Sequence, residues 1–103
     1  MVPSVELTRN LKTIASRALG AQVDVDLKGG ALLLSAQLGR LVVVDIKVED
    51  ALGEYEVTHR ISPWTTSLQI DTCDDMAHAL MDAAKRTGRV IAELEDFLKK
   101  SKA

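Results

Sequence analysis

The sequence predicts an α+β fold: an N-terminal helix, a five-stranded antiparallel meander sheet and a long C-terminal helix, in a single domain spanning residues 1–103. Between Ala21 and Asp71, apolar and polar residues alternate with a period of two in five segments, which is typical of half-buried strands. On either side of this region apolar residues recur at intervals of three and four, which is typical of amphipathic helices. We therefore expect both helices to cover the apolar face of the sheet.

The first helix is predicted between a start signal and a stop signal. Ser4 follows Pro3 as an N-cap, and Gly20 supplies a C-terminal stop. Apolar residues between them recur at helical spacing: Leu7, Leu11, Ile14, Ala15, Ala18 and Leu19. This segment is expected to form an amphipathic helix of about four turns.

Five strands are expected, at residues 22–27, 32–38, 42–49, 54–61 and 68–72. Residues that lie opposite one another in an antiparallel pair point to the same face, so the spacing of the apolar residues constrains the register. The resulting pairs are Leu27 with Leu32, Val25 with Leu34, Leu38 with Val42, Val48 with Tyr55, and Ile61 with Leu68. In this register no apolar residue conflicts with its predicted face.

The C-terminal helix is predicted from Asp74 onward and ends among lysines that oppose the helix dipole. About 27 residues make ~40 Å of helix, whereas strands of about seven residues span only ~23 Å. The helix is therefore expected to extend beyond the sheet. Gly88 interrupts the pattern, and we interpret it as a close contact between elements, with a helix break as the alternative.

The expected overhang predicts a homodimer. The last turns of the helix carry an apolar stripe that the sheet would leave exposed: Val90, Ile91, Leu94, Phe97 and Leu98. Exposed apolar stripes usually mark a partner surface, and a two-fold contact between identical surfaces is the commonest form of association. In the alternative, the helix breaks at Gly88 and folds back over the first helix.

A second predicted surface is the outer, polar face of the sheet. The register places Asp24, Ser35, Asp45, Thr58 and Asp71 in one row across the strands, with Glu56 and Arg60 in neighbouring rows. Such a face suits a basic protein partner, or else it is simply solvated. Trp64, the only tryptophan, lies in the following loop, where it either covers the end of the core or anchors a partner.

The composition argues against several classes of function. A net charge of −2 gives no basic footprint for nucleic acid, and no apolar run approaches the ~20 residues needed to cross a bilayer. Residues 1–4 resemble no signal peptide, and the single cysteine, Cys73, excludes an internal disulfide, so we expect a cytoplasmic protein. The sequence shows no catalytic, metal-binding or cofactor-binding motif, and we expect none of these sites.

The leading hypothesis is therefore a non-enzymatic protein-interaction module that acts as a homodimer, in the manner of an accessory protein of the chaperone, inhibitor or immunity type. One alternative is a small-ligand-binding protein or enzyme with a pocket near Tyr55, His59 and Trp64. The alternation assigns His59 to the apolar face, opposite Val44. A further alternative is a structural subunit of a larger assembly.

Overall fold

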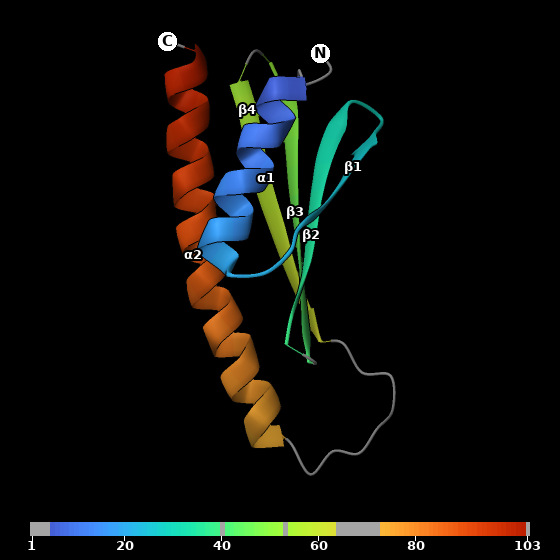
Figure 1. The fold of residues 1–103 in the computed structure, drawn as a ribbon, viewed down its shortest axis with the longest axis vertical. Helices are drawn as coiled ribbons and strands as arrows, with labels where there is room; N and C mark the ends of the chain where they lie inside the picture. Colours follow the sequence, from blue (N-terminus) through green and yellow to red (C-terminus); the bar gives the residue numbers. More distant parts are fainter. Residues whose placement is uncertain (1–4, 40, 53, 64–72, 103) are drawn as a thin grey trace.

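The computed structural model describes residues 5–39, 41–52, 54–63 and 73–102. The elements are helix α1 (Val5–Leu19), strands β1 (Asp24–Lys28), β2 (Ala31–Leu38), β3 (Val42–Ala51) and β4 (Glu54–Pro63), and helix α2 (Cys73–Lys102). The strands form one antiparallel sheet in the order β1-β2-β3-β4, and both helices pack on the same face of it (Figure 1). The predicted α+β class and meander order are confirmed.

The number of strands differs from the prediction. The described residues form four strands instead of five, and the predicted fifth strand, residues 68–72, lies outside them. Trp64 and Asp71 also lie outside the described residues. Within the described sheet, β1 and β4 are the two edge strands.

The predicted register is confirmed in the first two hairpins and wrong in the third. Leu27 lies opposite Leu32, and Leu38 lies opposite Val42. In the third hairpin Val48 lies opposite Val57 instead of Tyr55, because the strands pair as far as Ala51 and Glu54 and leave only two residues between them. Leu52, in this turn, has a φ of 53°, the left-handed conformation typical of two-residue hairpin turns. A shift of two residues leaves every side chain on its predicted face.

The core lies between the sheet and the helices. Alternate residues of β3, from Val42 to Val48, are at most 1% exposed, as a strand with one covered face requires. The other main contributors are Leu32, Leu34 and Ala36 from β2, Leu11, Ala15 and Leu19 from α1, and Ala83, Val90, Leu94 and Leu98 from α2. The apolar sides of α1 and α2 therefore pack on the same face of the sheet.

Helix α2 is continuous, and its C-terminal half belongs to the core. Val90 and Leu94 are 0% exposed and Leu98 is 4% exposed, while Ile91 and Phe97 are partly buried against the same core. The prediction that these five residues form an exposed stripe is wrong. The helix extends past the sheet at its N-terminal end instead (Figure 1), because its last turns lie beside the start of β4, where Leu98, Tyr55 and Val57 line one groove.

Gly88 does not mark a close contact. It lies on the exposed side of α2, and a Cβ atom added there would meet nothing within 4 Å among the described residues. Both sequence interpretations of Gly88, a close contact and a helix break, are therefore wrong, since the helix runs through this position.

We expect Gly88→Ala to raise the free energy of unfolding by about 0.5–1 kcal/mol, because alanine loses less backbone entropy in a helix and meets no obstacle here. Equilibrium urea denaturation measures the change. Gly29→Ala is the matched control: space is also open there, but its φ of +60° is unfavourable for alanine, so stability falls by about 1 kcal/mol. A loss of stability in Gly88→Ala would contradict the open environment of Gly88.

Candidate functional site

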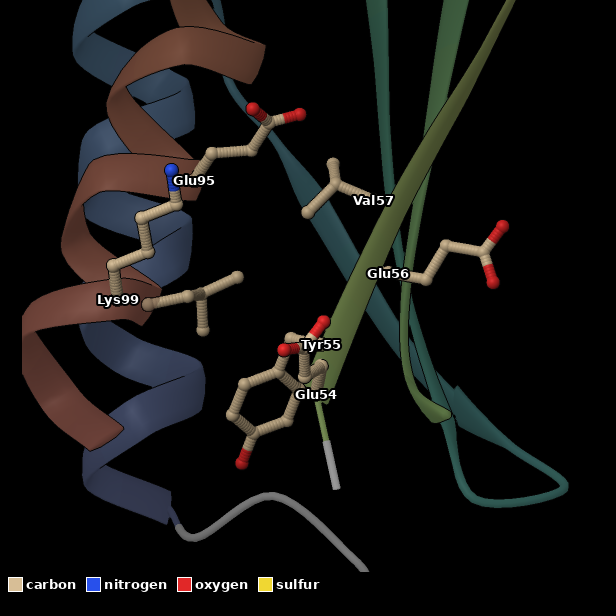
Figure 2. A pocket seen from close by; sticks show the side chains of 7 residues that line it. Glu54, Tyr55, Glu56, Val57, Glu95 and Lys99 are labelled. Atoms are coloured by element: carbon tan, nitrogen blue, oxygen red, sulfur yellow. The ribbon is translucent and has the colours of Figure 1, made fainter. Parts of the chain in front are cut away.

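The candidate site is an open groove between the first half of β4 and the last turns of α2 (Figure 2). Its volume is about 490 Å³, and its lining residues are Glu54, Tyr55, Glu56 and Val57 from β4 and Glu95, Leu98 and Lys99 from α2. Because β4 is an edge strand of the described sheet, the groove runs along a strand edge that pairs with no other described strand.

Two local periodicities build the groove. Alternation along β4 turns Tyr55 and Val57 toward α2 and Glu56 away from it (Figure 2). On α2, Leu98 belongs to the buried stripe, whereas Glu95 and Lys99 are exposed neighbours four residues apart on one side of the helix. The groove therefore has an apolar floor and a charged rim.

The rim is predominantly acidic. It carries two carboxylates, from Glu54 and Glu95, and one ammonium group, from Lys99, while the Glu56 side chain points away from α2 to the outer face (Figure 2). None of these carboxylates forms an ion pair within the described part of the chain. Glu56 also lies opposite Glu49 of β3, an arrangement of like charges that destabilises a strand pair. A cationic group at this rim would meet carboxylates that have no other counterion among the residues described.

The predicted acidic row on the outer face forms only in part. Asp24, Ser35 and Asp45 lie in one row, as predicted, and the Ser35 hydroxyl donates a hydrogen bond of 2.8 Å to the Asp45 carboxylate. The register shift of β4 places Arg60, instead of Thr58, opposite Asp45. The row therefore ends on a cation, and Asp24, Asp45, Glu56 and Arg60 are all exposed on the outer face.

His59 lies on the predicted face of the sheet, but it is not buried there as predicted. It lies opposite Ile46 instead of Val44, and it is exposed. The reason is that β4 and α2 diverge toward Pro63, so that the helix covers the first half of the strand more closely than the second (Figure 1). Of the predicted pocket, the groove contains Tyr55, His59 is not among its lining residues, and Trp64 is not described.

Sequence reasoning missed most of the groove. Glu54, Glu95, Leu98 and Lys99 line it, but the sequence predicted a dimer contact for Leu98 and assigned no binding role to the other three. The spacing of Glu95 and Lys99 beside the apolar stripe shows that they flank the buried side of the helix. It does not show which strand the helix covers.

No protein-family model, curated protein or solved structure matches this chain. In the part of the chain that the structure describes, no three His, Cys, Asp or Glu side chains are grouped as metal ligands would be. Nor does any described helix combine the length and apolarity that crossing a membrane would require.

Proposed function

We propose that this protein is a non-enzymatic protein-interaction module that binds an extended segment of a protein along the edge of β4. The observation that carries the proposal is the coincidence of an edge strand with an apolar groove. This activity suits an accessory protein of the chaperone, inhibitor or immunity type. We also propose a cytoplasmic location, supported by the single cysteine, which suits a reducing compartment.

The strand edge supplies the backbone half of the binding site. An edge strand presents a row of N–H and C=O groups that can pair with an added strand. Strand β4 is ten residues long, and among the described strands it pairs with β3 alone. The main-chain hydrogen bonds of an added strand would supply affinity without regard to sequence.

The groove supplies the side-chain half. An added strand lies about 4.8 Å from β4, and every second side chain of it points to the helix side of the sheet. On that side the floor is formed by Tyr55, Val57 and Leu98, which favours apolar side chains. The carboxylates of Glu54 and Glu95 favour basic side chains at the groove, and the Glu56 carboxylate favours them on the outer face of the sheet. The expected ligand is therefore an extended segment that combines apolar and basic side chains.

Selection of displayed random peptides against the full chain tests this proposal. We expect the selected peptides to combine apolar and basic residues and to protect the amides of β4, but not those of β1, from hydrogen exchange. In the double variant Glu54→Lys/Glu95→Lys, reversal of two rim charges should weaken binding about tenfold or more. The control Glu6→Lys/Glu93→Lys makes the same change in net charge at exposed helical positions that do not line the groove.

Two results would contradict the proposal. One is an equal loss of peptide binding in the rim variant and in its control, which would mean that the weaker binding comes from the change in net charge alone. The other is protection of amides outside β4 by the selected peptides, which would move the binding site to another part of the molecule.

A further inference from the structure

We infer that the segment bound along β4 is strand β4 of a second copy of this chain, so that two sheets join about a two-fold axis at Thr58. The inference rests on the proposed function, since it names the occupant of the same strand edge. Three observations on β4 support it: the register that its residues allow, the charges that form no ion pair within the described part of the chain, and the partly exposed helix-side face of its second half.

The parity of the side chains restricts the register. A two-fold contact pairs residue i with residue j and residue j with residue i, and both residues must point to the same face of the joined sheet. Pairing centred on Thr58 spans Glu54 to Ser62, almost the full length of β4. Pairing centred on His59 is equally long but places Pro63 in the ladder, where it has no N–H to donate.

Charge complementarity favours the same register. With Thr58 at the centre, Glu56 lies opposite Arg60 of the second copy, and the symmetry forms this pair twice. Within one chain Glu56 faces Glu49. Arg60 lies opposite Asp45 but makes no ion pair among the described residues. Centring on His59 would instead place Glu56 opposite Ser62 and Arg60 opposite Thr58, which leaves both charges without a counterion.

The helix side of β4 is also complementary to itself. Its first half borders the groove, whereas its second half carries the exposed His59 and the half-buried Ile61. The two-fold axis places the second half of each copy beside the first half of the other. His59 and Ile61 of the second copy then lie opposite Val57 and Tyr55 and enter the groove, close to the carboxylates of its rim.

Analytical ultracentrifugation of the full chain tests the inference. At micromolar concentrations we expect a mass twice the 11.2 kDa of the chain. Arg60→Glu and Glu56→Arg should each weaken the association about tenfold or more, because each turns two attractive cross-strand pairs into repulsive ones. The double variant Glu56→Arg/Arg60→Glu restores opposite charges and should restore the dimer.

Lys28→Glu is the matched control, since it reverses an exposed charge on β1, the other edge strand, and should leave the mass unchanged. Circular dichroism and thermal unfolding establish that every variant is folded. A dimer that survives the single charge reversals, or is not restored by the double variant, overturns the β4 pairing.

A monomeric wild-type chain also overturns the inference. The peptide selection then tests separately whether the edge of β4 binds another protein, as the proposed function requires. If peptides still bind along β4, the strand edge serves another protein, and its carboxylates act as charges that prevent self-association. If no peptide binds there either, the inference and the proposed function fail together.

Discussion

Replacing Leu94 by alanine is expected to lower the free energy of unfolding by about 2–5 kcal/mol. Leu94 is 0% exposed and belongs to the cluster in which α2 meets the sheet and α1. Truncation removes its transfer free energy from the folded state and leaves a cavity that the surrounding side chains fill only in part. Since a domain of this kind is stabilised by only about 5–15 kcal/mol in total, urea denaturation should show a large shift of the midpoint.

Met81→Ala is the control for this prediction. Met81 lies on the same helix but is 60% exposed, so its truncation should change stability by about 0.5 kcal/mol or less. Both variants should be compared at one fixed protein concentration, because the proposed dimerisation would make apparent stability depend on concentration. If Leu94→Ala costs no more than Met81→Ala, the assignment of Leu94 to the core is contradicted.

The properties that sequence reasoning predicted correctly are those that depend on local periodicity. Residues of β3 alternate between core and solvent from Val42 to Val48, and this period of two is visible in the sequence itself. The spacing of Leu11, Ala15 and Leu19 likewise indicates the buried side of α1. From these patterns follow the α+β class, the antiparallel order and the face on which each described side chain lies.

The properties that it missed depend on turns and on contacts between distant segments. The third hairpin has a shorter turn than predicted because Leu52 adopts a positive φ, which leucine seldom does. No pattern in the sequence indicates this conformation. The position of α2 along the sheet depends on packing between distant segments, which places Leu98 in the same groove as Tyr55. An apolar stripe identifies which side of a helix is buried, but it does not show how far along the strands the helix is placed. The end of α2 that extends beyond the sheet was therefore predicted at the wrong terminus.

Arg86 shows the same limit, because its spacing in the sequence does not show that it reaches the end of α1. Its Nη1 donates a hydrogen bond of 2.8 Å to the carbonyl oxygen of Leu19, the last residue of α1. The final carbonyl groups of a helix have no partner within the helix, and the adjacent end of the helix dipole is negative. The guanidinium therefore satisfies one of these carbonyls and places a cation where the dipole favours it.

We expect Arg86→Met to lower the free energy of unfolding by about 1–2 kcal/mol, because the carbonyl of Leu19 loses a charged donor while most of the aliphatic stem is kept. Urea denaturation measures the total change. Hydrogen exchange shows where it arises: the last turn of α1 should lose protection before the rest of the helix does.

The ion pair of Arg86 with Asp82 offers a way to separate two explanations of this loss. The pair is 3.0 Å long, but its side chains are 42% and 56% exposed, and exposed pairs contribute about 0–1 kcal/mol. Asp82→Asn removes the pair and leaves the bond to Leu19, so it should cost about 0.5 kcal/mol or less. An equal cost for Asp82→Asn and Arg86→Met would mean that the ion pair alone is responsible. A clear excess for Arg86→Met, with the change in exchange confined to the end of α1, would mean that α2 stabilises α1 by binding its final carbonyl group.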